Sequence, residues 1–276
     1  MGWKFVIVRY SEIFLKSDFV RNQLTKRLSL NIKNGIKREG INAKVKRLRD
    51  VILIETNETK KTTKLLRHIF GIVSFSPAIK IQLDEIEDFF KKNSEKLING
   101  KFAVRVSRKG KHEFTSNELA AKIGEIISNT IKAKVNLKKP DTEIFLDVRD
   151  QEVYIYKQKI KGPGGIPIPS QGKINCYIDS REDLIACWLM MKRGCRPIVF
   201  FRDYPTDVLD KWSYGIKIER IKVNGIQDTP EGPIVVGINL EKDGFTKLKE
   251  AGSRFITPVI SFTREEMDKI WERIKT

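Results

Sequence analysis

Cysteine and histidine are scarce in this chain of 276 residues. It has three cysteines and none forms a C-x-x-C pair, which excludes a disulfide framework and a zinc-binding pattern. We expect Cys176 and Cys187 to be packed in the interior and Cys195 to be more open. The two histidines, His68 and His112, have no acid or cysteine at catalytic spacing. We therefore predict no metal site and assign no catalytic residue.

Long apolar runs are also missing, since none reaches the 18 residues of a membrane-spanning helix. The first ten residues lack the basic start, apolar core and cleavage site of a signal peptide. With 40% hydrophobic and 32% charged residues, the chain is globular and long enough for two or three domains. We expect a cytoplasmic protein that makes no membrane contact.

Positive charge is abundant, and it is unevenly distributed. Residues 1–165 hold 35 Lys and Arg against 19 Asp and Glu, a net charge of +16, whereas residues 166–276 hold 18 against 16. A basic excess confined to one part of a chain is typical of proteins that bind the phosphate backbone of nucleic acids. The alternative is a lysine-rich surface that only improves solubility.

The first block of the chain alternates strands and helices in the order βαββαβ. Apolar residues recur every four positions from Val20 to Ile36, which predicts an amphipathic helix over Asp18–Arg38 that stops at Gly40. The other predicted elements are strands at 2–8, 43–48, 51–56 and 72–81 and a helix at 59–70. This order predicts a ferredoxin-like domain over residues 1–76.

The second block, residues 77–165, contains a clear helix start. Thr115 and Glu118 form a capping box, and Phe114 with Leu119 provides the hydrophobic staple. We further predict a helix at 84–98, a strand at 101–107 and a hairpin of strands at 143–148 and 152–159. A basic loop at 108–112 lies between the strand and the capped helix.

This loop is the strongest nucleic-acid candidate in the chain. Arg105, Arg108, Lys109 and Lys111 could converge on phosphates, helped by the helix N-terminus at Thr115–Asn117. Solvated runs of charge are common, so a purely structural role is the alternative.

The last block, residues 166–276, reads as a small doubly wound parallel sheet. A strand at 174–178, an almost wholly apolar helix at 181–193 and a strand at 197–201 predict a parallel βαβ unit. Further strands are predicted at 216–223, 233–238 and 254–260, with helices at 244–251 and 264–275. The fold class is thus mixed, α+β in the first two blocks and α/β in the third.

Several ordered segments resemble the tRNA 4-thiouridine synthetase family, often called ThiI. R-Y-S-E-I-F-L-K at Arg9–Lys16 is similar to that family's first motif, and Phe102–Ser116 resembles its THUMP RNA-binding domain. The linker at Lys161–Pro167 and W-L-M-M-K-R-G at Trp188–Gly194 follow in family order. The resemblance implies that tRNA is the partner and that its backbone lies on Arg105, Arg108 and Lys111. The candidate RNA-binding residues are Arg9, Lys16, Arg105, Arg108, Lys109, Lys111 and Asn117.

The nucleotide loop departs from the family, whose S-G-G-x-D-S sequence cradles a pyrophosphate. Aligned on Trp188, this loop falls on residues without glycine: Ile178, Asp179, Ser180, Arg181, Glu182 and Asp183. A phosphate approaches backbone N–H groups closely only where no Cβ intrudes, and carboxylates at a helix N-terminus occupy the position it needs. We predict a degenerate pyrophosphatase-like loop, with ATP and Mg²⁺ as cofactors only if the site works.

Two main hypotheses follow. The first is a tRNA-binding, ThiI-like protein that has lost its own adenylation site and acts with a separate sulfur donor or catalytic protein. The second is an active synthetase with a rebuilt loop. A methyltransferase is disfavoured because no G-x-G-x-G turn follows a strand. A structural scaffold and a homodimer are left open.

Overall fold

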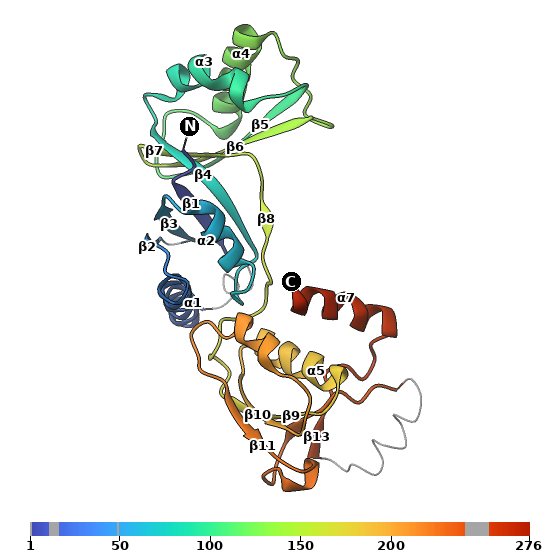
Figure 1. Cartoon of the computed structure of the whole chain (residues 1–276). Coiled ribbons are helices and arrows are strands. Elements are labelled where there is room, and N and C mark those ends of the chain that lie inside the picture. Colours follow the sequence, from blue (N-terminus) through green and yellow to red (C-terminus); the bar gives the residue numbers. More distant parts are fainter. Residues whose placement is uncertain (1, 11–16, 49, 241–253) are drawn as a thin grey trace. The chain divides into compact units, whose positions relative to one another are not determined.

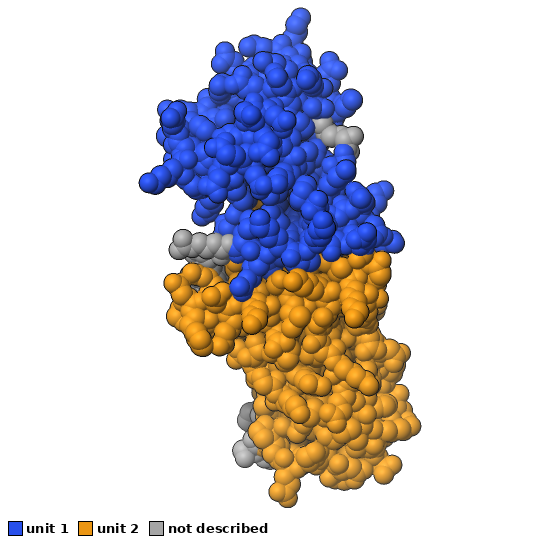
Figure 2. Space-filling model, turned by 90° about the vertical axis from the view of Figure 1, so that its left-hand side faces the viewer, with its two compact units in different colours: residues 1–8, 42–63, 74–161 blue, residues 9–41, 64–73, 162–276 orange. Residues whose placement is uncertain are grey.

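The computed structural model describes residues 2–10, 17–48, 50–240 and 254–276. These residues form two compact units (Figure 2). The first unit comprises residues 1–8, 42–63 and 74–161, and the second comprises residues 9–41, 64–73 and 162–276. Lys16 and the predicted helix at 244–251 lie outside the described residues.

The first unit is built on one sheet whose strand order is β2-β3-β1-β4-β7-β6-β5, with β8 paired to β4 (Figure 1). The order β2-β3-β1-β4 is that of a ferredoxin-like sheet, and the long strand β4 carries the sheet on into β7, β6 and β5. The strands are β1 (Phe5–Arg9), β2 (Ala43–Arg47), β3 (Val51–Thr56), β4 (Ser74–Gln82), β5 (Phe102–Lys109), β6 (Thr142–Arg149), β7 (Glu152–Tyr156) and β8 (Ile160–Lys161).

Two helices, α3 (Ile86–Leu97) and α4 (Ser116–Ile131), share a core with β5, β6 and β7. Phe90, Phe102 and Ile123 are completely buried in that core. The predicted capping box at the start of α4 is confirmed, because Thr115 and Glu118 exchange hydrogen bonds. Phe114 and Leu119 pack in the same cluster, as a staple requires.

The second unit includes α1 (Asp18–Arg38), whose bounds agree with the predicted ones. Leu24, Leu28 and Ile32 lie on its buried face, as the four-residue spacing indicates. Asn31, also buried, donates a hydrogen bond to the carbonyl oxygen of Ile168 at 2.6 Å. The helix α2 (Thr59–Leu66) ends four residues before its predicted end, because a turn leads to Gly71, which has φ +97°.

The C-terminal sheet is entirely parallel, with the strand order β11-β10-β9-β12-β13. The first strand in sequence, β9, lies in the middle, so the chain winds outward first through β10 and β11 and then through β12 and β13. This is the predicted doubly wound order. The strands are β9 (Lys173–Ile178), β10 (Arg196–Phe201), β11 (Glu219–Lys222), β12 (Ile234–Val235) and β13 (Phe255–Ile256).

Two helices, α5 (Arg181–Lys192) and α7 (Arg264–Lys275), and two short 3-10 helices, η2 (Asp207–Trp212) and η3 (Ile226–Asp228), complete this region. Trp188 of α5 packs edge-on against Trp212 of η2, with 5.1 Å between ring centroids, and Phe70 stacks on Trp212. The residues 184–188 of α5 are all buried, as its apolar sequence predicts. In the described part of the chain, no helix is both long and apolar enough to cross a membrane.

Two expectations about this region are wrong. The last three strands are shorter than predicted, because β12 and β13 each keep two residues in the sheet before the chain turns away. Cys195 is buried like Cys176 and Cys187, since the turn at Gly194 folds it back and its N–H donates to the carbonyl oxygen of Met190 at 3.1 Å. Burial raises the pKa of the Cys195 thiol, so nothing marks it as an activated nucleophile.

Candidate functional site

The loop between β9 and α5 lies where a doubly wound sheet places its ligand, at the switch point between β9 and β12. Ser180 is the N-cap of α5, and its hydroxyl oxygen accepts a hydrogen bond from the Asp183 N–H at 3.2 Å. The same hydroxyl donates to Asp183 Oδ2 at 2.6 Å. Two reciprocal hydrogen bonds between Ser180 and Asp183 therefore cap the first turn of the helix.

The Asp183 carboxylate also accepts hydrogen bonds from backbone N–H groups on both sides of the switch point. Its Oδ2 accepts from the Asp179 N–H at 3.1 Å, and its Oδ1 accepts from the Gly237 N–H at 2.6 Å. Burial raises the pKa of Asp183, while the three hydrogen bonds to its oxygens oppose that rise. The side chain thus occupies the place of an anion, with donors directed at it.

Gly237, just after β12, is fitted against this loop so closely that a side chain would not be tolerated. A Cβ at this position would lie 2.1 Å from the carbonyl carbon of Glu182 and 2.3 Å from the nitrogen of Asp183. Both are backbone atoms, which cannot move aside cheaply. A glycine is therefore required here, because only glycine lets the chain after β12 approach the loop this closely.

The remaining charged side chains of the loop are paired within the protein. Asp179 accepts from Arg202 at 3.0 Å and from the Tyr177 hydroxyl at 3.4 Å. Arg181, the one basic residue of the loop, forms ion pairs with Asp268 of α7 and with Glu182. Within the described ranges, no three or more His, Cys, Asp and Glu residues are grouped so that they could hold a metal ion.

The predicted RNA-binding residues of the first unit are only partly brought together. Arg105 donates through Nε to Glu143 Oε1 at 3.1 Å and through its guanidinium to the Leu137 carbonyl oxygen at 2.6 Å. With Asn117 of α4 it lines a groove of about 670 Å³ between α4, β5 and the segment around Leu137. These contacts hold the guanidinium in a fixed place beside an open groove.

Arg108 and Lys109 do not lie in a loop, because β5 continues to Lys109 and pairs there with Arg149 of β6. Consecutive strand residues point to opposite faces, so these two cations diverge. Arg108 lies near Glu118 and helps to lower its pKa, which hydrogen bonds from Thr115 lower most. On the other face, Lys109 lies close enough to Asp50 to favour its charged form.

The other candidates are distributed more widely. Lys111 is exposed in the turn after β5, where His112 Nε2 lies 2.9 Å from the Asp150 carbonyl oxygen. Arg9 ends β1, and its carbonyl oxygen accepts from the Val73 N–H at 2.9 Å. It belongs to the second unit, whereas Arg105 and Asn117 belong to the first. Sequence reasoning missed Glu143 and Gly237, which carry no local signal for their contacts.

Sequence comparisons agree with the architecture of the N-terminal part of the chain, up to residue 157. A family model described as the ThiI ferredoxin-like domain matches residues 5–76, and the THUMP domain model matches residues 82–157. Together they match more than half of the chain. The chain belongs to the ThiI family. Neither model reaches residues 178–183.

The curated relatives, each named a probable tRNA sulfurtransferase, are longer than this chain. A probable tRNA sulfurtransferase of Methanobrevibacter smithii is 36% identical over 213 residues, which are 74% of this chain and 55% of that protein. The probable tRNA sulfurtransferase of Saccharolobus islandicus is 36% identical over 239 residues, 80% of this chain and 63% of that protein. The chain therefore spans between half and two thirds of the length of these relatives.

Two solved structures share the fold. A Pyrococcus horikoshii protein of known crystal structure superimposes with a TM-score of 0.83 and 28% identity, covering 99% of this chain and all of that one. A 4-thiouridine synthetase, crystallised as an RNA complex with bound ATP, gives a TM-score of 0.78 at 21% identity. That match covers 98% of this chain and 84% of the synthetase and shows the common fold.

Proposed function

We propose that this ThiI-family protein binds tRNA for 4-thiouridine modification and that its own loop does not bind ATP for adenylation. The observation that carries the proposal is the Asp183 carboxylate, which takes the donors of Asp179, Ser180 and Gly237 at the switch point. In this proposal the domains are those of the sequence prediction, residues 1–76, 77–165 and 166–276, and the protein acts in the cytoplasm.

The energetics support a loop closed to phosphate. The three hydrogen bonds to Asp183 contribute about 1 kcal/mol each, so a pyrophosphate would have to replace about 3 kcal/mol of existing interaction before gaining anything. It would also meet the negative charges of Asp179, Glu182 and Asp183 at the helix N-terminus. Arg181 and Arg202, which could offset that repulsion, are already paired with carboxylates.

The RNA half of the proposal rests on charge and on the THUMP domain. The net charge of +16 lies in residues 1–165, which hold both matched domains. Arg105 pairs with Glu143, but its side chain is 41% exposed, and with Asn117 it lines a groove that suits phosphate and sugar contacts. Sulfur activation and delivery are then tasks of a separate protein, and a homodimer stays a prediction.

Two titrations test this function with the full chain. We expect labelled tRNA to bind at moderate salt and Mg-ATP to give no heat of binding by calorimetry. The variant Arg105→Glu should weaken tRNA binding on the order of tenfold, because it reverses a charge facing the RNA backbone. Lys96→Glu, an exposed position on α3, is the matched control and should change the affinity far less.

Two results would contradict the proposal. The first is the absence of tRNA binding by the wild-type chain. The second is tight Mg-ATP binding together with ATP consumption that depends on uridine 8 of the tRNA. That second result would establish the alternative of an active synthetase with a rebuilt loop.

A further inference from the structure

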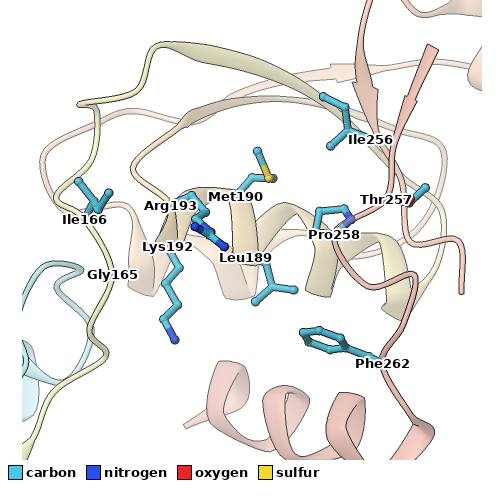
Figure 3. Close-up of a pocket in the computed structure, with 10 residues that line it drawn as sticks. All are labelled: Gly165, Ile166, Leu189, Met190, Lys192, Arg193, Ile256, Thr257, Pro258 and Phe262. Atoms are coloured by element: carbon cyan, nitrogen blue, oxygen red, sulfur yellow. The ribbon is translucent and has the colours of Figure 1, made fainter. Parts of the chain in front are cut away.

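A pocket of about 610 Å³ lies in the second unit, and none of its lining residues belongs to the loop at 178–183 (Figure 3). Three segments line it: the linker at 165–166, the last turn of α5 at 189–193 and the turn at 256–262 between β13 and α7. The pocket's first residue on α5, Leu189, follows Asp183 by six residues, which is roughly 9 Å along the helix axis. This pocket is therefore a separate site.

The linker wall is fixed to the end of α5. The Ile166 N–H donates to the Lys192 carbonyl oxygen at 2.9 Å, and Gly165 has φ +76°. A Cβ on Gly165 would lie 2.2 Å from that same carbonyl oxygen, so only glycine lets the linker pass this close. Two sequence motifs that the nucleotide loop does not use, G-G-I-P and M-M-K-R-G, thus meet here.

The opposite wall is equally well built. The side-chain amide of Asn239 donates to the carbonyl oxygen of Val259 at 3.1 Å and to that of Phe262. The Phe262 N–H donates to the Val259 carbonyl oxygen at 3.0 Å and closes the turn. Because this turn is held by internal hydrogen bonds, the Phe262 ring is presented on a defined backbone.

The chemistry of the lining is apolar on one side and cationic on the other. Figure 3 shows the Phe262 ring extending toward Leu189, while Lys192 and Arg193 project from the end of α5. None of the ten lining residues is acidic. The Lys192 ammonium also lies 5.6 Å from the centroid of the Trp188 ring, which keeps its stem along α5. Such a lining suits an anion that carries a flat apolar body.

We propose that this pocket binds one nucleotide, with its base against Phe262 and Leu189 and its phosphate at Arg193 and Lys192. Aromatic rings and guanidinium planes stack on any base, and the guanidinium also pairs with phosphate in a bidentate manner. The volume lies within the range of pockets that enclose small ligands. The nucleotide is either one residue of single-stranded RNA or a free nucleoside monophosphate. The RNA form rests on the tRNA binding proposed above, whereas the free form does not.

Two titrations of the full chain distinguish the sources. Fluorescein-labelled pentauridylate is followed by anisotropy at low salt, and UMP and AMP are titrated by calorimetry. Arg193→Ala, at an exposed position, should weaken binding about tenfold, and Phe262→Leu should weaken it severalfold. Lys222→Ala, on the edge strand β11, removes the same charge outside the pocket and should have little effect.

A crosslink locates the bound base independently of affinity. Pentauridylate carrying 5-bromouracil should, after irradiation, give an adduct on the peptide that contains residues 256–262. Binding of UMP or AMP that depends on Arg193 assigns a free-nucleotide site, and binding of the oligonucleotide alone assigns an RNA site. The inference is overturned if no probe binds, or if binding is unchanged in Arg193→Ala and the adduct lies elsewhere.

These outcomes are separable from those of the proposed function. If tRNA binds the wild-type chain, but probe binding is unchanged in the pocket variants and the crosslink lies outside residues 256–262, only the pocket proposal fails. If tRNA does not bind at all, the proposed function fails, and the UMP and AMP titrations still decide whether the pocket holds a free nucleotide.

Discussion

The Asp183→Ala variant tests whether the carboxylate at the switch point holds the C-terminal sheet together. The substitution removes the acceptor of three hydrogen bonds, from the Asp179 N–H, the Ser180 hydroxyl and the Gly237 N–H. Each bond contributes about 1 kcal/mol net to folding, and the donors left behind are partly buried. We therefore expect the free energy of unfolding to fall by about 3 kcal/mol.

Urea denaturation followed by tryptophan fluorescence is a suitable assay. Three of the four tryptophans belong to the second unit, and Trp188 and Trp212 are almost completely buried there. Glu182→Ala is the matched control, since it removes a neighbouring carboxylate of the same helix turn. That side chain is 38% exposed and lies 3.6 Å from Arg181 in a surface ion pair, so its loss should cost less than about 1 kcal/mol.

The pH dependence of the Asp183→Ala effect has a definite sign. Because burial raises the folded-state pKa of Asp183 above 3.8, its contribution to stability is fully present below pH 3.8 and declines as the pH rises through the folded-state pKa. The cost of Asp183→Ala should thus be larger at pH 4 than at pH 7. Equal losses for Asp183→Ala and Glu182→Ala would refute the assignment of Asp183 as the central acceptor.

Further predictions concern the packing of the loop and the first unit. Gly237→Ala should lower the free energy of unfolding by about 1–3 kcal/mol, because its Cβ would meet the backbone of Glu182. An unchanged urea midpoint would contradict this. Asp50 accepts two hydrogen bonds from Arg149, at 2.6 and 3.0 Å. Although burial alone would raise the pKa of Asp50, the hydrogen bond and charge of Arg149 lower it, so its contribution is present above pH 3.8 and lost as the pH falls. Asp50→Asn should therefore lower the free energy of unfolding by about 2 kcal/mol at pH 7 and by less at pH 3. Urea denaturation followed by far-ultraviolet circular dichroism measures both values, and a loss that does not depend on pH would contradict the ion pair.

The elements with strong local signals could be predicted from the sequence. The four-residue spacing of apolar residues predicts α1 with its observed bounds, and the Thr115 capping box locates the start of α4. The apolar helix between two apolar strands predicts the parallel unit of β9, α5 and β10. In each case the determining interactions lie within a few residues of one another along the chain.

Contacts between distant residues could not be predicted. That Arg108 and Lys109 belong to a strand depends on pairing of β5 with β6, about 40 residues later. The Gly237 N–H reaches Asp183 across 54 residues, and no local pattern marks that glycine. The sequence predicts the strand and the helix that flank residues 179–180, whereas the groups that donate hydrogen bonds to the Asp183 carboxylate are found only in the structure.

The central position of β9 also bears on how the second unit assembles. The pairings of β9 with β10 and of β10 with β11 join residues closer together along the chain than the pairing of β9 with β12 does, so they close shorter loops. The strand β12 must instead return to the side of β9 that is still open. When β12 pairs with β9, the Gly237 N–H comes within hydrogen-bonding distance of Asp183. We therefore expect the hydrogen bond between Gly237 and Asp183 to replace one to water in a late folding step.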